Sequence, residues 1–249
     1  MKAVVLCAGR GTRLGSLTAQ TPKPLLPIQG QPLITYTMRW LASAGVTQLY
    51  VNLHYQKEQI QTCLGDGSLW GVSIHYLYEP ELLGTAGTVR ALASELTEPF
   101  LVVYGDNLIG CSLSRFLAAH KRYEGLGTIA LFKTQDVQLS GIAVFDGRYR
   151  IRRFIEKPSS SERVSPWINA GLLMLQPAIL DRIPRQQPCD FSRDCMPQWL
   201  AEDLPIFGYC MGPDEPLLWI DTPEKYEMAQ AHPWARQYFM KDMAKQAIE

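Results

Sequence analysis

A glycine-rich turn that carries an arginine follows the first predicted strand of this sequence. Residues 2–6 favour a buried strand, and Gly9, Gly11 and Arg13 come soon after it. Glycines let backbone N–H groups approach a phosphate closely, because no Cβ intervenes. A Walker A loop is excluded because neither glycine starts a Gly-x4-Gly-Lys-Ser/Thr run, and Leu14 stands where a dinucleotide fingerprint needs its third glycine. The turn is a phosphate-binding candidate of a third kind, with a tight surface turn as the alternative.

Ten residues after this arginine, a lysine stands between two prolines. Pro22 and Pro24 hold the backbone around Lys23 extended, so the ammonium group is presented from a stiff support. Arg13 and Lys23 together can neutralise the β- and γ-phosphates of a nucleotide, and the arginine fork can do so with two parallel hydrogen bonds. The two cations predict a nucleoside triphosphate as the ligand.

Two aspartates each follow an apolar run. Asp106 comes after residues 100–104, and Asp221 comes after residues 217–220. Open α/β sheets bind ligands at the carboxyl ends of their strands, and proteins hold Mg²⁺ with one or two carboxylates plus phosphate oxygens. The pair is therefore predicted to hold Mg²⁺. For either aspartate alone, a strand-end turn or a helix cap is the commoner role.

Strand-like and helix-like runs alternate through the first half of the chain and must position these groups. The predicted strands are 2–6, 48–53, 72–78 and 100–104, and the predicted helices are 32–44, 56–64, about 86–95 and 112–124. Shorter, strand-rich runs follow at about 127–133, 141–146, 151–155 and 167–175. This pattern favours an α/β fold with a mostly parallel sheet covered by helices. No linker or repeat interrupts it, so we expect one domain over 1–232 and a polar helical tail at 233–249.

Composition excludes several classes of function. The 24 Lys and Arg balance the 24 Asp and Glu, so no global field attracts nucleic acid. No apolar window approaches the roughly 18 residues that a membrane span needs. The six cysteines form no CxxC pair, which favours reduced thiols in a cytoplasmic protein. We expect no nucleic-acid or membrane partner, and a homo-oligomer stays open.

The motif Gly9-Arg10-Gly11-Thr12-Arg13-Leu14, followed by Pro22-Lys23-Pro24, resembles the signature of the sugar-phosphate nucleotidylyltransferases. The resemblance covers about residues 1–230. It implies a Rossmann-like, three-layer α/β/α fold of the glycosyltransferase-A type, with a mixed, mostly parallel sheet. It also implies a Mg²⁺ requirement and transfer of a nucleotidyl group from a nucleoside triphosphate to a sugar 1-phosphate. The nucleotide-binding half is then about 1–125 and the sugar-binding half about 126–232.

The resemblance and the motifs together assign roles to particular residues. The expected catalytic residues are Arg13, Lys23, Asp106 and Lys157. The expected nucleotide-binding residues are Leu6, Ala8, Gly9, Gly11, Thr12, Arg13, Lys23, Glu79, Gly84 and Thr85. The expected sugar-phosphate-binding residues are Asn107, Gly141, Glu156, Lys157, Asn169 and Trp219, and the expected metal ligands are Asp106 and Asp221. Without the family, the pair Glu156-Lys157 is typical of a solvated surface, and a core role for Trp219 is at least as common.

The prediction of the nucleotide base depends on Glu79. Thymidylyltransferases of the family have a glutamine at this position, whose amide both donates and accepts, whereas a carboxylate only accepts. A carboxylate suits guanine N1–H and N2–H₂ or cytosine N4–H₂, and the run at 83–87 resembles the mannose-1-phosphate guanylyltransferase-like branch. GTP with mannose 1-phosphate or a related hexose or heptose is favoured. CTP, UTP or dTTP with another sugar 1-phosphate stays open, as does an exposed acidic role for Glu79 at a helix start.

Two other classes of protein remain as alternatives to a nucleotidylyltransferase. A glycosyltransferase shares the fold but usually has an Asp-x-Asp motif, and here the run is Asp106-Asn107-Leu108. A non-catalytic regulatory subunit tends to lose charged positions that are all present here. The sequence after Asp221 lacks the family's Gly-Thr-Pro spacer, which leaves the geometry there less defined. We expect no appended left-handed β-helix, and thus no acyltransferase activity.

Overall fold

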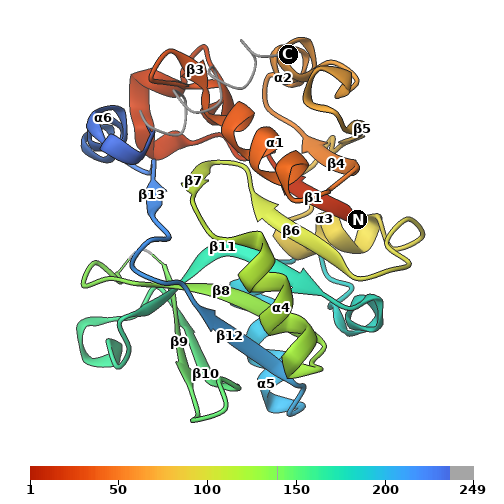
Figure 1. Ribbon diagram of the computed structural model, residues 1–249, viewed down its shortest axis with the longest axis vertical. Coiled ribbons are helices and arrows are strands. Elements are labelled where there is room, and N and C mark those ends of the chain that lie inside the picture. Colours follow the sequence, from red (N-terminus) through yellow and green to blue (C-terminus); the bar gives the residue numbers. More distant parts are fainter. Residues whose placement is uncertain (139, 236–249) are drawn as a thin grey trace.

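A nine-stranded sheet runs through both halves of the chain in the computed structural model, which describes residues 1–138 and 140–235 (Figure 1). Seven strands follow the order β10-β9-β11-β6-β1-β4-β5, and β8 joins β11 to β12. The strands are β1 Lys2–Leu6, β4 Gln48–Leu53, β5 Ser73–Tyr78, β6 Phe100–Tyr104, β8 Gly127–Lys133, β9 Gly141–Phe145, β10 Ile151–Glu156, β11 Trp167–Leu175 and β12 Ile206–Cys210.

The strands of the first half are parallel, and their carboxyl ends meet at one edge. Leu6 on β1 lies opposite Asn52 on β4 and Tyr104 on β6. Beyond β6 the sheet changes direction, because β11 pairs with both β6 and β8 in antiparallel fashion. The prediction of a mixed α/β sheet is confirmed. The parallel part is the half that carries the glycine-rich turn at residues 9–13, called the opening loop from here on.

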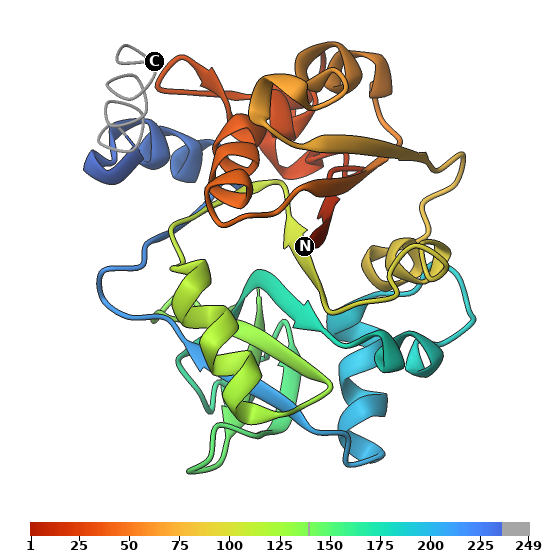
Figure 2. The same ribbon diagram turned by 45° about the vertical axis from the view of Figure 1, so that its right-hand side comes forward.

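Helices cover both faces of the sheet (Figures 1 and 2). Alternate residues of β1 point to the two faces: Val5 belongs to one apolar core and Val4 to the other. The first core includes α1 Leu33–Ser43, α2 Lys57–Leu64 and α4 Leu113–Tyr123. The second core includes α3 Thr85–Ala91 and α5 Met196–Ala201. This is the three-layer arrangement that the sequence predicts.

A small antiparallel ribbon lies outside the main sheet and joins distant parts of the chain. It pairs β7 Asn107–Ile109 with β13 Leu217–Trp219, with Trp219 opposite Asn107. Figure 1 places it beside α6 Pro223–Ala231, near the junction of the upper and lower parts of the molecule. The ribbon brings residue 106 and residue 221 together, although they are far apart in sequence.

Some expectations differ from the structure. The third helix ends at Ala91 rather than near 95, because the N–H groups of Leu92 and Ala93 donate to carbonyls three residues back, which tightens the chain into turns. The short elements β2 Pro27–Ile28, β3 Gln31–Pro32, η5 Pro177–Arg182 and η6 Phe191–Cys195 have no counterpart in the sequence prediction. Each is too short to show a full hydrophobic period.

The predicted tail helix lies, beyond residue 235, outside the described residues. Within the described part, no helix is long and apolar enough to span a membrane.

Candidate active site

A cavity of about 370 Å³ opens at the carboxyl ends of β1, β4 and β6. That volume is in the range of small-molecule sites. Most of the residues predicted for the site line it: Leu6, Ala8, Gly9, Arg13, Glu79, Gly84, Thr85, Asp106, Asn107, Gly141, Glu156, Asn169, Trp219 and Asp221. A second cavity of about 240 Å³ shares four of these residues and adds Gly11, Thr12 and Lys23. The structure therefore gathers residues of both halves around one site.

The opening loop packs directly on the lysine that follows it. Gly11 has a φ of +64°, and a Cβ at this position would lie 3.0 Å from the Cβ of Lys23. The chain then enters the 3₁₀ segment η1 Thr12–Thr18, where the hydroxyl of Thr18 donates to the carbonyl of Gly11 at 3.0 Å. A glycine is needed at position 11 both for its backbone angle and for the room that Lys23 takes.

The buried ammonium of Lys23 bridges the two aspartates predicted to hold a metal. Its Nζ lies 2.8 Å from Asp106 Oδ2 and 3.1 Å from Asp221 Oδ1, and its side chain is 5% exposed. A nitrogen of Arg13 adds a third contact, 3.3 Å from Asp221 Oδ1. A buried lysine requires such partners, since an unpaired ammonium is costly to desolvate. Two cations and two carboxylates thus meet at the point where the two cavities join.

The residues at this point fit a Mg²⁺ ion. Asp106 and Asp221 supply hard oxygen ligands, and the ammonium between them marks a place that attracts a cation. Within the described part of the chain, no group of three or more His, Cys, Asp or Glu could hold a metal. Phosphate oxygens or waters would therefore have to complete the coordination shell, as is usual for this ion.

Glu79 is buried at one end of the cavity and is held by three donors. It is 1% exposed, so the alternative of an exposed acidic residue is excluded. Its Oε1 accepts from Asn52 Nδ2 at 2.9 Å and from the hydroxyl of Thr88 at 2.6 Å. Its Oε2 accepts from the backbone N–H of Leu83 at 3.0 Å. Since a carboxylate oxygen accepts about two hydrogen bonds, one acceptor position stays open on Oε2.

The residues predicted to bind the sugar phosphate gather at the opposite end. A Cβ at Gly141 would lie 2.3 Å from the ring of Phe154 and 2.8 Å from Glu156 Oε2, so only glycine fits there. Burial and the nearby carboxylate of Asp190 raise the pKa of Glu156 above its usual value. Asn169 lies where β11 bulges, and its Oδ1 accepts from the N–H of Gly171 at 2.9 Å. The bulge turns a strand side chain toward the cavity.

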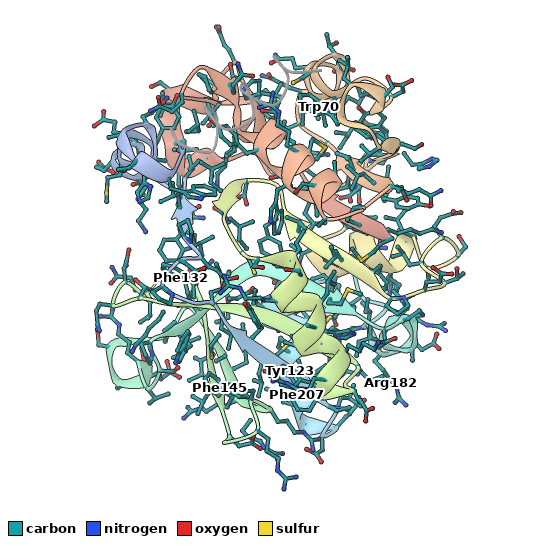
Figure 3. The ribbon with its side chains drawn as sticks, viewed as in Figure 1. Trp70, Tyr123, Phe132, Phe145, Arg182 and Phe207 are labelled. Carbon is teal, nitrogen blue, oxygen red and sulfur yellow. The ribbon has the colours of Figure 1, made fainter. Side chains whose placement is uncertain are left out.

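Trp219 lines the cavity and is held by aromatic and cationic neighbours. Its ring meets that of Phe132 edge-on, with centroids 5.5 Å apart. Phe132 lies near the end of β8 and is labelled in Figure 3. The ammonium of Lys225 lies 5.2 Å from its centroid. Trp219 is therefore neither a fully buried core residue nor a free surface residue.

Lys157 does not line the site with the other predicted residues. It directly follows β10, is exposed, has a φ of +48° and lies outside the residues that line either cavity. Its role in binding the sugar phosphate stays a prediction.

All six cysteines are free, and four are buried, as reduced thiols would be.

Known proteins resemble this chain over most of its length. A family model described as nucleotidyl transferase matches residues 2–233. The chain belongs to this family. It is 33% identical over 92% of its length to a mannose-1-phosphate guanylyltransferase of Mycobacterium tuberculosis, and 31% identical over 93% to a UTP–glucose-1-phosphate uridylyltransferase of Synechocystis. It spans 63% and 62% of the length of these two relatives.

A crystal structure confirms the fold of this nucleotidyl transferase family member. The solved structure is that of a Bacillus anthracis protein in complex with sucrose. It matches with a TM-score of 0.83 at 20% identity, over 93% of this chain and 94% of the other.

Several lining residues of this family member were not predicted from its sequence. They are Asn52, Leu82, Thr88, Tyr104, Ser140, Gly171, Asp190 and Ser192. Asn52 had a detectable signal, because it is a polar residue inside the apolar strand β4. Asp190 and Ser192 had none, since Asp190 precedes and Ser192 lies within the single π-helical turn η6, which has no recognisable period.

Proposed function

We propose that this chain transfers a nucleotidyl group from a nucleoside triphosphate to a sugar 1-phosphate and releases pyrophosphate. The observation that carries the proposal is the cluster of Arg13, Lys23, Asp106 and Asp221 at the carboxyl ends of the parallel strands. The buried acceptor Glu79 and the half-buried acceptor Glu156 line the same cavity as Arg13, Asp106 and Asp221 of this cluster. The activities named for the two curated relatives support the same reaction class.

The reaction needs positioned charge rather than a nucleophilic side chain. An oxygen of the sugar phosphate is already anionic at neutral pH and attacks the α-phosphorus in line, without a general base. The new bond joins this oxygen to the α-phosphorus, while the bond between the α-phosphorus and the bridging oxygen to the β-phosphorus breaks. The bridging oxygen leaves with pyrophosphate, and Arg13 and Lys23 stabilise the charge that develops there.

Mg²⁺ is the cofactor we propose, with Asp106 and Asp221 as its protein ligands. Bound there, it would neutralise phosphate charge during the transfer. Lys23 binds both carboxylates. Its ammonium has three N–H donors and uses two of them for these carboxylates, so one donor is left for a phosphate oxygen of the nucleotide.

GTP is the proposed nucleotide because of the acceptor at Glu79. Burying a carboxylate without a cationic neighbour is costly, and here an amide, a hydroxyl and a backbone N–H hold it. The acceptor position left on Oε2 matches an N–H of guanine or the N4–H₂ of cytosine, and it opposes O4 of uracil or thymine. Mannose 1-phosphate or a related hexose or heptose 1-phosphate is the proposed acceptor substrate.

Pyrophosphate release from a panel of nucleotides and sugar 1-phosphates with Mg²⁺ tests the proposal. We expect release, fastest with GTP, and a loss of two or more orders of magnitude in kcat for Asp106→Ala. Asp181→Ala is the matched control, because Asp181 is exposed and lies outside the cavity. Release with UTP or dTTP but not GTP would contradict the base assignment alone. No release with any combination would contradict the proposed reaction.

A further inference from the structure

The segment at 189–192 forms a wall of the cavity and is fastened to the loop that carries Glu79. The N–H of Cys189 donates to the carbonyl of Leu83 at 2.8 Å, and the carbonyl of Cys189 accepts from Ala86 and Gly87 at 3.0 and 3.1 Å. A Cβ at Gly84 would lie 2.3 Å from that carbonyl oxygen, so the two segments touch backbone to backbone. The side chains of this wall therefore have a fixed position relative to the nucleotide end.

The carboxylate of Asp190 is oriented by its neighbours and keeps one acceptor position. Its Oδ1 accepts from the N–H groups of Ser192 at 3.0 Å and Arg193 at 3.4 Å, as the cap of η6. Its Oδ2 accepts from the hydroxyl of Thr85 at 2.8 Å, and Thr85 in turn accepts from the N–H of Phe191 at 2.9 Å. Because an oxygen accepts about two hydrogen bonds, Oδ2 can take one more donor from the cavity that Asp190 lines.

The charges around Asp190 limit which part of a substrate can lie there. Glu156 lines the same cavity, and the carboxylate of Asp190 raises the pKa of Glu156. Among the described residues that line the cavity, Arg13 is the cation, and it lies beside Asp221. Lys157 and Arg193 also act on Glu156, but neither lines the cavity, so the charges that face the cavity at this point are the two carboxylates. Like charges repel, so a phosphate group would lie toward Arg13 instead. The end near Asp190 suits a neutral group rich in hydrogen-bond donors.

We propose that Asp190 determines sugar specificity by accepting a hydrogen bond from one ring or side-chain hydroxyl of the sugar 1-phosphate. This inference rests on the proposed function. It specifies the substrate class as neutral sugars with a donor at that position. A hydrogen bond from a hydroxyl to a carboxylate is stronger than one to a neutral acceptor, and leaving the buried acceptor unpaired penalises an analogue that lacks the hydroxyl.

A purely structural role for Asp190 makes a different prediction. If the carboxylate only capped η6, its replacement would affect all sugars equally. Asp190→Asn separates the two roles, because asparagine caps helices as well as aspartate does. The amide oxygen can keep the contacts to the backbone of η6, while the amide nitrogen takes the place of Oδ2 and donates instead of accepting.

The test measures kcat/KM for the preferred hexose 1-phosphate and its 2-, 3-, 4- and 6-deoxyfluoro analogues. In the unmodified protein, we expect one analogue to lose about 10- to 100-fold relative to the parent sugar. In Asp190→Asn, kcat/KM for this one analogue should come within about threefold of kcat/KM for the parent sugar. The ratios of kcat/KM between the parent sugar and the other analogues should stay the same. Because each ratio is compared between two proteins, the electronic effect of fluorine cancels.

Asp194→Asn is the matched control. Asp194 lies in the same segment, accepts from the N–H of Asp190 at 2.7 Å and pairs with Arg193, but does not line the cavity. This control should leave all four ratios unchanged. Equal ratios in the unmodified protein and in Asp190→Asn would overturn the inference while pyrophosphate release still supports the proposed function. Absence of release with every sugar phosphate would overturn both.

Discussion

At the scale of single residues, the site is a row of buried or half-buried charges that neighbours hold in place. Lys23 lies between Asp106 and Asp221, and Glu79 is bound by three donors. Desolvated charges destabilise a fold unless they are paired, so their concentration in one cavity is typical of a functional site. Burial and the neighbouring carboxylate of Asp190 disfavour the charged form of Glu156.

The raised pKa of Glu156 predicts a pH-dependent contribution to stability. Burial and the Asp190 carboxylate raise this pKa, so the folded state binds the proton more tightly than the unfolded state. The free energy of unfolding should therefore fall as the pH rises from the usual glutamate pKa through the raised value. Glu156→Gln removes this titration. Urea unfolding between pH 4 and pH 7 should show the variant gaining stability relative to the unmodified protein as the pH rises; a constant difference would refute the prediction.

At the scale of elements, the parallel strands and the small ribbon bring the site together. The carboxyl ends of β1 and β6 carry the opening loop and Asp106, while the pairing of β7 with β13 brings Asp221 beside them. The opening loop reaches this point through a glycine in the left-handed region, packed on Lys23. Its backbone therefore sets the position of the buried ammonium.

Two glycines offer a matched pair of substitutions, Gly11 in this loop and Gly71 far from the site. Both lie in the left-handed helical region, with φ of +64° and +71° and ψ of 32° and 23°, so alanine strains either backbone by about 1 kcal/mol. A Cβ at Gly11 also presses on Lys23, whereas a Cβ at Gly71 would meet open space. We expect Gly11→Ala to lower kcat/KM for the nucleotide by about tenfold or more, with Gly71→Ala close to the unmodified protein. Steady-state kinetics checks this, and equal losses would show that backbone strain alone matters.

The sequence predicted the elements and groups that repeat a regular pattern. The strand at 167–175 matches β11, and Gly11, Asp106 and Asp221 all line the site. It did not predict the partners of Lys23, because they depend on a ribbon of three residues per strand that pairs positions about 110 residues apart. Asp190 was missed because a single π-helical turn has no hydrophobic period.

At the scale of the whole molecule, both halves of the chain contribute to one cavity. Glu79 belongs to the half with the parallel strands, and Glu156 and Asp190 belong to the half in which antiparallel pairing begins (Figure 1). The opening loop with Arg13 follows β1, which lies in the sheet between β5, the strand before Glu79, and β10, which ends at Glu156. A molecule that carries both neutral donor-rich groups and phosphates matches this set of charges.

Oxygen labelling tests the central claim, the attack of the sugar phosphate on the nucleotide, most directly. The sugar 1-phosphate carries ¹⁸O on its non-bridging oxygens, and the products are examined by ³¹P NMR and mass spectrometry. Direct attack places one labelled oxygen in the bridge between the two phosphorus atoms of the nucleotide sugar and leaves pyrophosphate unlabelled. Label in pyrophosphate, or a bridge without label, would contradict the mechanism proposed for this site.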